Sequence, residues 1–338
     1  MPPQKLPADA PLIDRFGRIH RSLRLSVTDR CNLRCFYCMP EFGAQFAPRA
    51  TLLTFEEICR IVRLLAQRCG INDVRLTGGE PLVRKDFPKL IEMLAGITEI
   101  EDLSLTTNAI LLKEFAEPLH NAGLKRLNIS IDTLDEATFE SISRRKGVQK
   151  VIDGIDAAID VGFELIKLNT TAVKGVTESE IVSLVRFAIE RGVQIRFIEY
   201  MPLDSDRSWH SDDVLRGDMI RAIIEREFGP MSPVGPTQPS QPAVDFSLPG
   251  GHQIGLIQSV SKPFCDACDR IRLTADGAIR NCLFSQDEFS IRDRLRSGAP
   301  DEELIARFQA AVSAKAAGHG INDSSFSPPE RPMYMIGG

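Results

Sequence analysis

Three cysteines lie within eight residues near the start of the chain, in the segment CNLRCFYC. Cys31, Cys35 and Cys38 have the spacing Cys-x3-Cys-x2-Cys, and no fourth cysteine stands beside them. A structural zinc site normally takes four protein ligands. Three thiolates can instead hold three irons of a [4Fe–4S] cluster and leave the fourth iron open, as a reactive metal centre requires. The spacing therefore favours a cluster with one vacant coordination position.

Two other interpretations of this loop stay open. Zinc could bind the three thiolates together with a distant ligand, and His20 is the nearby candidate, although it precedes the expected strand and should lie at the opposite end. The cysteines could also be core residues without a shared role. Their clustering makes that last interpretation the weakest.

A second set of three cysteines follows late in the chain. Cys265, Cys268 and Cys282 have the spacing Cys-x2-Cys-x13-Cys, again without a fourth close by, and His252 is a conceivable zinc partner. The similarity to the first set favours a second [4Fe–4S] cluster with a free iron. Arg270 and Arg272 alternate on one face of the expected strand. Two cations beside an open metal position indicate a docking site for an anionic substrate.

Short β-branched runs alternate with helical patterns over the first two thirds of the chain, which predicts an α/β fold with a parallel sheet. Six strand–helix units are too few for an eight-fold barrel, so we expect an open or partial (β/α)6 barrel. The expected strands are residues 22–27, 73–77, 102–107, 126–131, 165–173 and 194–200. The expected helices lie near residues 54–69, 86–95, 111–121, 147–161, 178–191 and 213–228.

The character of the sequence changes after residue 228. Residues 229–244 contain five prolines and are typical of a linker or a wrapping loop. β-Hairpin patterns and two further helices, near residues 290–297 and 301–316, complete the chain. We therefore expect a barrel domain over residues 15–229 and a C-terminal domain over residues 230–338 that carries the second cysteine set.

Polar or glycine-rich segments stand where the expected strands stop, at the edge where parallel barrels gather their chemistry. These segments are TGGEP, TTN, SID, NTT and EYMP. In the first of them, Gly78 and Gly79 would let the backbone approach a ligand closely, because glycine has no Cβ. If the two glycines are considered alone, the alternative interpretation is a tight turn that leads into the next helix.

Four expected strands each carry one cation in apolar surroundings. A cation inside a packed barrel is costly unless it is paired. One such residue could reach the surface, but four on separate strands indicate an interior lined with positive charge. Such an interior fits a polyanion such as a nucleoside triphosphate. The four cations are Arg24, Arg75, Lys167 and Arg196.

The whole-chain composition limits the other functional classes. A net charge of -5 supplies no general attraction to nucleic acid or to an anionic membrane. The 338 residues contain no apolar run long enough to span a bilayer. We therefore expect a cytoplasmic protein whose thiols stay reduced. Cys59 and Cys69 are interpreted as ordinary core or surface thiols.

The segment CNLRCFYC resembles the signature of the radical S-adenosylmethionine (SAM) superfamily. The resemblance implies a radical SAM barrel in which the open iron of the first cluster binds the amino and carboxylate groups of SAM. It also implies that Tyr37 contacts the adenine and that the GGE segment, Gly78, Gly79 and Glu80, binds the SAM amino group.

The whole chain is similar to a narrower family, the MoaA proteins, which are GTP 3′,8-cyclases of molybdenum cofactor biosynthesis. The similarity runs from RLSVTDRCNLRC through RLTGGEP, NISID and CDRIR to the terminal RPMYMIGG. It implies two [4Fe–4S] clusters and SAM as cofactors, with Ser130 and Met201 added to the SAM site. The implied GTP site consists of Arg24, Arg75, Thr106, Lys167, Arg196, Arg270, Ile271 and Arg272. Gly337 and Gly338 would insert into the active site and assist catalysis.

The resemblance further implies the reaction and its partners. GTP would be converted to 3′,8-cyclo-7,8-dihydroguanosine 5′-triphosphate, an external one-electron reductant would be needed, and a MoaC-type synthase would take the product onward. A homodimer is an open expectation, whereas no nucleic-acid or membrane partner is expected. The alternatives are a radical SAM maturase that modifies peptides with an auxiliary cluster, and a non-catalytic iron–sulfur electron carrier. One departure from the family pattern is Ala109, where glycine is common.

Overall fold

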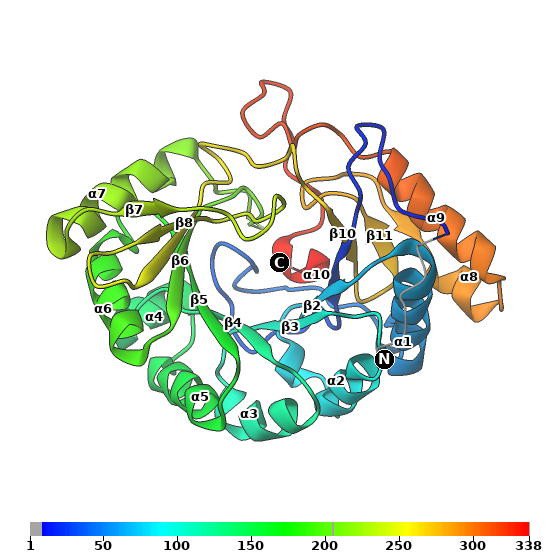
Figure 1. Cartoon of the computed structure of the whole chain (residues 1–338), viewed down its shortest axis with the longest axis horizontal. Helices are drawn as coiled ribbons and strands as arrows, with labels where there is room; N and C mark the ends of the chain where they lie inside the picture. Colours follow the sequence, from blue (N-terminus) through cyan, green and yellow to red (C-terminus); the bar gives the residue numbers. More distant parts are fainter. Residues whose placement is uncertain (1–8, 205, 338) are drawn as a thin grey trace.

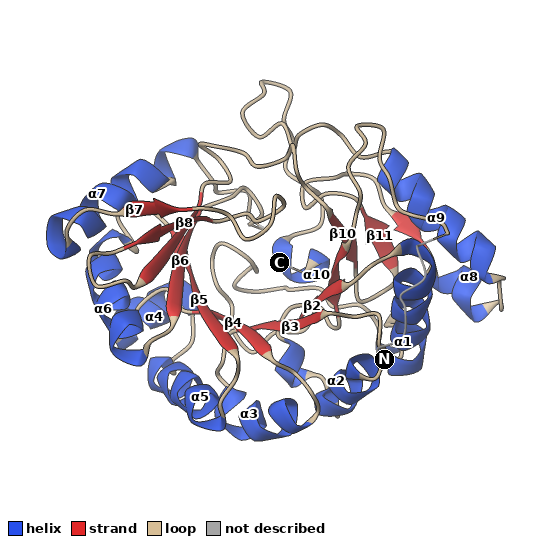
Figure 2. Ribbon diagram, viewed as in Figure 1, coloured by secondary structure: helices blue, strands red, loops and turns tan. Residues whose placement is uncertain are grey.

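The computed structural model describes residues 9–204 and 206–337. A twelve-stranded sheet curves into an open arc; most helices cover its outer face, and the last helix lies inside the arc (Figures 1 and 2). The strands are β1 (Ser22–Ser26), β2 (Asp73–Thr77), β3 (Asp102–Thr107), β4 (Arg126–Ser130), β5 (Leu165–Ala172), β6 (Gln194–Glu199), β7 (Ser232–Val234), β8 (Val244–Ser247), β9 (Gln253–Ile257), β10 (Arg270–Leu273), β11 (Ala278–Arg280) and β12 (Phe289–Ser290). The α-helices are α1 (Phe55–Leu64), α2 (Phe87–Ala95), α3 (Leu112–Asn121), α4 (Glu136–Ser143), α5 (Val148–Val161), α6 (Ile181–Arg191), α7 (Gly217–Phe228), α8 (Arg292–Arg296), α9 (Asp301–Ser313) and α10 (Met333–Ile336).

The six predicted strands lie side by side in sequence order and pair in parallel, as strand–helix–strand units require. The prediction of an α/β partial barrel is confirmed. Strands from the C-terminal part of the chain extend this sheet at both edges. β10 pairs in parallel with β1, and β9 pairs in parallel with β6. The domain boundary after residue 229 stays a prediction.

Local sequence signals account for most of the helices. Thr54 caps α1 and Glu57 returns the hydrogen bond, which completes the predicted capping box. The helix continues as a π turn over Leu65–Cys69 and ends at Gly70, whose φ of 78° favours glycine. The predictions missed two helices, α4 and α10. Both are short, and α4 begins at Asp135, whose side chain accepts from the N–H of Thr138.

The apolar core lies between the arc of strands and the outer helices. Leu23, Val74, Leu105 and Ile129 belong to this core and are buried. The face of the sheet that lines the inside of the arc carries most of the charged strand residues described below. Among the described residues, no helix is both long enough and apolar enough to cross a membrane.

Candidate functional site

The first cysteine loop begins directly after β1 and rests on the segment that follows β2. The N–H of Gly79 donates to the carbonyl of Thr28 at 2.6 Å, and the N–H of Glu80 donates to the carbonyl of Arg30 at 2.8 Å. A Cβ on Gly78 would lie 2.4 Å from the Thr28 oxygen, and one on Gly79 would lie 2.4 Å from the Arg30 oxygen. The close approach that requires these glycines is therefore made to the backbone of the cysteine loop.

The three thiols of this loop, called the first trio, lie close enough for their charges to interact. Burial raises the pKa of Cys31 to about 11, and burial together with Cys31 and Cys38 raises the pKa of Cys35. The Nδ2 of Asn108 donates to the Sγ of Cys31 at 3.7 Å. The Nδ2 of Asn32 is buried and has no acceptor among the residues described. Thiols that are neutral without metal must release protons on binding iron, and the positive charge of the iron would then stabilise the buried thiolates.

Glu80 holds the strand ends together. Its Oε1 accepts from the N–H of Leu82 at 3.0 Å and the hydroxyl of Thr107 at 2.7 Å, and its Oε2 accepts from the N–H of Asn108 at 2.7 Å. Burial raises its pKa to about 7. Both carboxylate oxygens are thus committed to donors of the protein, so the side chain positions the loops after β2 and β3.

The other residues predicted for SAM lie at the same edge of the sheet as the first trio. Tyr37 lies within the cysteine loop, and its hydroxyl donates to the Oδ2 of Asp132 at 2.6 Å. Burial raises the pKa of Asp132 to about 6. Ser130 ends β4 and Met201 follows β6, both at the carboxyl edge of the sheet. Asp132 was not singled out from the sequence, although it belongs to the strand-end segment SID.

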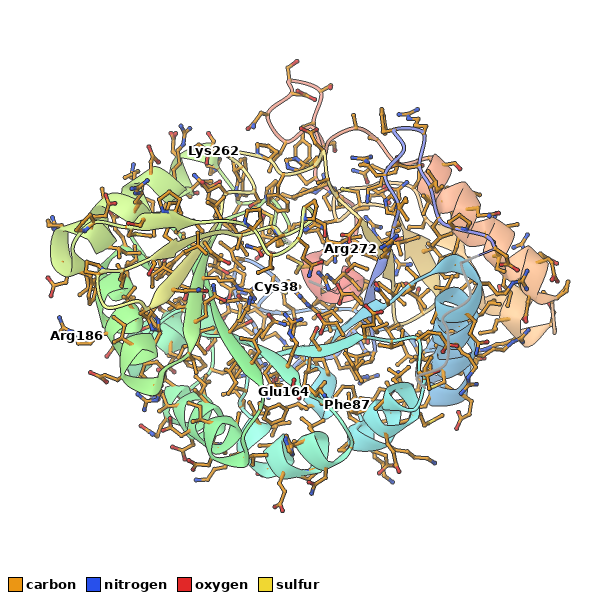
Figure 3. All side chains as sticks on the ribbon, in the orientation of Figure 1. Cys38, Phe87, Glu164, Arg186, Lys262 and Arg272 are labelled. Carbon is orange, nitrogen blue, oxygen red and sulfur yellow. The ribbon has the colours of Figure 1, made fainter. Side chains whose placement is uncertain are left out.

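A row of three arginines crosses the inside of the arc. Arg24 of β1 stands directly opposite Arg272 of β10 on one side and Arg75 of β2 on the other. We call these residues the cation row, and Figure 3 shows Arg272 inside the arc. Burial, followed by the charge of Arg24, lowers the pKa of Arg75 well below its usual value and that of Arg272 to about 9. Like charges in register destabilise a sheet, so the row favours a bound anion.

Two more of the predicted cations extend this interior charge. Burial, then Arg196, lowers the pKa of Lys167 on β5 to about 8. Arg196 on β6 is buried, and its Nε donates to the Oδ1 of Asn169 at 3.0 Å. A Cβ on Gly255 would lie 2.6 Å from the Cγ of Arg196, so glycine makes room for the arginine. Arg126, which the sequence analysis missed, adds a further cation on β4 and pairs with Asp102.

Thr106 and Ile271 complete the predicted GTP residues. Thr106 is half-buried on β3, opposite Asn128 of β4. Ile271 is fully buried in β10, opposite Leu23, and belongs to the hydrophobic core. Its side chain therefore packs in the core of the sheet. Only its backbone, between Arg270 and Arg272, can belong to the predicted GTP site.

The second cysteine set, called the second trio, lies at the other end of the barrel. Cys268 precedes β10 and Cys282 follows β11, which runs antiparallel to β10. The start of β10 pairs with the start of β1, Arg270 standing opposite Ser22. The second trio therefore lies at the amino ends of the strands, whereas the first trio follows their carboxyl ends. The cation row crosses the barrel between the two trios.

Two cations contact a sulfur of the second trio. The Nε of Arg270 lies 3.4 Å from the Sγ of Cys268, and the Nζ of Lys315 lies 3.3 Å from it. Burial alone would raise the pKa of Cys268, but these two cations outweigh it and lower the pKa to about 6. The sequence analysis missed Lys315. The available signal was a lone lysine in the small-residue run AAVSAKAAG.

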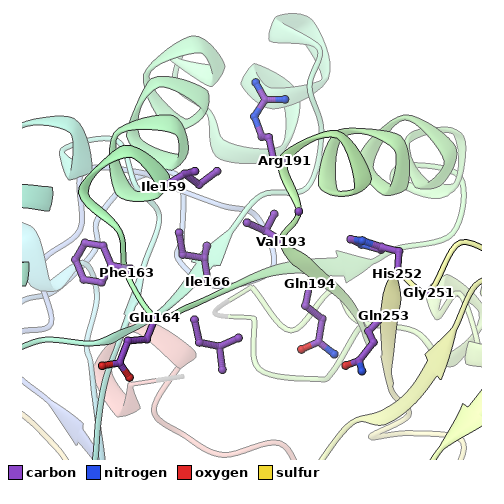
Figure 4. Close-up of a pocket in the computed structure, with 12 residues that line it drawn as sticks. Ile159, Phe163, Glu164, Ile166, Arg191, Val193, Gln194, Gly251, His252 and Gln253 are labelled. Carbon is purple, nitrogen blue, oxygen red and sulfur yellow. The ribbon is translucent and has the colours of Figure 1, made fainter.

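The histidines considered as fourth ligands lie elsewhere. His20 precedes β1, away from Cys31, and its Nδ1 lies 3.1 Å from the carbonyl oxygen of Arg18. His252 follows β8 and lines a cavity of about 450 Å³ together with Phe163 and Arg191 (Figure 4). Within the described ranges, no three side chains of His, Cys, Asp or Glu are grouped to hold a single metal ion.

The chain ends inside the arc of strands (Figure 1). The Nη1 of Arg272 donates to the carbonyl of Gly337 at 2.9 Å. Gly337 has a φ of 86°, and a Cβ there would lie 2.8 Å from the Cβ of Ser26. The tail therefore reaches the cation row through a position that only glycine fits without strain. Gly338 lies outside the described residues.

Comparisons with known proteins match this arrangement. The family model described as Radical SAM superfamily matches residues 25–188, and the one described as Molybdenum Cofactor Synthesis C matches residues 193–321. The GTP 3′,8-cyclase of Rhodopirellula baltica is 58% identical, over 97% of this chain and 92% of its own length. The GTP 3′,8-cyclase of Mycolicibacterium smegmatis is 44% identical, over 98% of this chain and 93% of its own.

Among solved structures, Streptococcus suis SuiB bound to the precursor peptide SuiA superimposes with a TM-score of 0.60. The match has 16% identity and covers 88% of this chain and 68% of that one, so it supports the fold alone. The fold and the first trio define a radical SAM protein. Within that class, the chain belongs to the family of the GTP 3′,8-cyclases.

Proposed function

We propose that this protein is a radical SAM GTP 3′,8-cyclase that forms 3′,8-cyclo-7,8-dihydroguanosine 5′-triphosphate, the first step of molybdenum cofactor biosynthesis. The observation that supports it best is the cation row between two cysteine trios. Arg24 lies 3.7 Å from Asp73, but Arg75 and Arg272 form no ion pair among the described residues, so a polyanion would relieve the repulsion along the row. GTP brings several negative charges and a reactive ribose and base in one molecule.

The first trio would hold a [4Fe–4S] cluster, and the loops around it would hold SAM. The chemistry that this cluster and SAM would supply, once the cluster is reduced, is a 5′-deoxyadenosyl radical able to remove hydrogen from C3′ of GTP. Tyr37 would contact the adenine, with its hydroxyl fixed by Asp132. Gly78 and Gly79 would present backbone groups to the SAM amino group, and Glu80 would keep that backbone in place. Ser130 and Met201 would complete the pocket at the carboxyl edge.

The triphosphate would lie along the interior cations. The register of Arg24 with Arg75 and Arg272 supports this proposal, and arginine suits phosphate oxygens because its donors form a planar fork. Lys167 and Arg196 would bind from β5 and β6, farther along the arc, and Thr106 would bind from β3, which pairs with the strand of Arg75. Arg270 and the backbone of Ile271 would hold the part of GTP that faces the second trio.

The second trio would hold another [4Fe–4S] cluster, which would supply an open coordination position for the guanine. The donor set fits, because Cys268 already lies beside two cations that stabilise a thiolate. Gly337 and Gly338 would take part from the tail, close to Arg272. A MoaC-type synthase would consume the product, and a one-electron carrier would reduce the first cluster. We place the reaction in the cytoplasm, where such thiols stay reduced, and leave a homodimer as a proposal.

Anaerobic reconstitution followed by iron and sulfide counting tests the metal content, and about eight irons per chain are expected from two four-iron clusters. Reduced protein supplied with SAM and GTP should then yield the cyclised nucleotide, identified by mass spectrometry. SAM cleavage without conversion of GTP would contradict the proposal and favour another radical SAM activity. A protein that holds only zinc would contradict it altogether.

A further inference from the structure

Lys315 is a buried lysine whose charge has no evident use in the fold. Its exposed fraction is 4%, and burying an ammonium group is costly unless an anion accompanies it. Its Nζ donates to the carbonyl of Arg270 at 2.7 Å and to the Sγ of Cys268 at 3.3 Å. Among the described residues, no carboxylate forms an ion pair with Lys315, and the group in contact that can balance its charge is the sulfur of Cys268. The second trio is therefore its counter-charge.

The chain fixes this lysine rather than leaving it to swing. Lys315 follows α9, whose carbonyl at Ala311 accepts from the buried Nδ2 of Asn281, the residue before Cys282. Beyond Lys315, the Nη2 of Arg18 donates to the carbonyl of Ala316 at 2.7 Å, and its Nη1 donates to those of Ala317 at 2.8 Å and Cys265 at 2.7 Å. The segment that carries Lys315 is thus tied to both ends of the second trio.

Lys315 also differs from the arginine beside it. Arg270 lies 4.9 Å over the ring of Phe264 and belongs to the proposed substrate site. Both cations contact the sulfur of Cys268, but Lys315 also donates to the backbone carbonyl of Arg270, so it joins the start of β10 to the trio. A hydrogen bond and a positive charge at a ligand sulfur stabilise the more reduced, more negative cluster.

We propose that Lys315 is a positioning residue of the second cluster: it donates a hydrogen bond to the Cys268 sulfur, supplies the compensating charge, and so keeps the reduction potential of that cluster high. This proposal rests on the proposed function, because it requires a cluster on the second trio. It concerns only that cluster, and the first cluster serves as an internal control.

Lys315→Met in the reconstituted full-length protein tests this role, because methionine keeps a similar length without charge or donor. An EPR-monitored redox titration gives the midpoint of each cluster, and the signal that SAM perturbs identifies the first. We expect the second midpoint to fall by about 59 mV, which is a tenfold change in the reduced-to-oxidised ratio. The matched control is Lys262→Met, which removes an exposed lysine three residues before Cys265 in the sequence and should leave both midpoints in place because water screens that charge.

An unchanged second midpoint in Lys315→Met, with both clusters present, would overturn the proposal while the proposed function stands. If Lys315→Met loses the second cluster, Lys315→Arg decides: restored iron and midpoint support a charge partner, whereas a continued loss shows that Lys315 only packs the segment. Wild-type protein with iron for a single cluster would contradict the proposed function itself. The iron count thus separates the two failures.

Discussion

The charged side chains inside the barrel lower the stability of the fold, and we attribute their presence to substrate binding. Arg24, Arg75 and Arg272 lie side by side on three strands. Apolar residues at these positions would make the sheet more stable, because they would not repel one another. Lys167 has a lowered pKa for the same reason, since burial and Arg196 disfavour its charge. Each of these residues should gain more from a bound triphosphate than an exposed cation would, because the interaction is formed away from water.

Lys167→Ala should therefore weaken GTP binding by about ten- to a hundredfold, since a charge-assisted contact contributes roughly 1.5–3 kcal/mol. Uncoupled SAM cleavage should be largely retained, because the lysine lies outside the SAM residues. The matched control is Lys125→Ala, which removes an exposed lysine paired with Glu164. Anaerobic equilibrium binding of GTP measures the effect. Equal affinity in Lys167→Ala and Lys125→Ala would remove Lys167 from the site.

At the scale of elements, the contact between the cysteine loop and the segment after β2 determines whether the first trio is assembled. Gly79 has no space for a side chain, because its Cβ would meet the backbone of Arg30 rather than a movable side chain. Ala109 begins the segment after β3 with a φ of 59°, where glycine would be less strained. The loops at this edge therefore pack backbone against backbone, and the fold tolerates the strained backbone of Ala109 in one of them.

Gly79→Ala should displace the cysteine loop and reduce the iron that the first trio retains. Gly235→Ala is the matched control, since the Cβ position at Gly235 is open. Iron per chain after reconstitution measures the outcome, with circular dichroism to verify that both variants fold. We expect Gly235→Ala to match the wild type and Gly79→Ala to lose about half of the iron, because one cluster of two is affected. Full iron in Gly79→Ala would show that the loop can move away without loss.

The tail is the other element whose placement has a testable consequence. Removing Gly337 and Gly338 should spare the fold and both clusters, because the sheet and its helices are complete before α10. Turnover of GTP should be lost, since the contact between Arg272 and the Gly337 carbonyl disappears from the interior. Product formation and iron content measured on the same sample check both statements. A truncated protein with wild-type turnover would exclude a role for the tail.

At the scale of the whole molecule, local patterns predicted the strands well and their assembly only in part. Alternation of apolar residues and capping patterns located the first six strands and most helices, because each of these patterns involves only a few neighbouring residues. The position of the second trio depends on β10 pairing with β1, a contact between segments far apart in the sequence. The contacts of Arg18 with Cys265 and of Lys315 with Cys268 have the same origin. No short motif reports such contacts, so the predictions missed them.

His20, in the N-terminal segment, should make the stability of the fold depend on pH. His20 is fully buried before β1, and burial, then the charge of Lys315, lowers its pKa to about 4 against the opposing effect of Asp14. The unfolded chain binds a proton near pH 6.5, whereas the folded chain does not until about pH 4. Stability from this group is therefore complete above pH 6.5 and is lost as the pH falls toward 4.

Between pH 7 and pH 5, this single residue should cost the fold about 2 kcal/mol. His20→Gln should remove that cost, because glutamine does not titrate and can still donate to the carbonyl of Arg18, which lies 3.1 Å from the ring Nδ1. Urea unfolding of both proteins at the two pH values measures the difference, and the variant should lose about 2 kcal/mol less than the wild type on acidification. Parallel losses would mean that His20 accepts its proton within the fold, through a rearrangement of Asp14 and Lys315 around the ring.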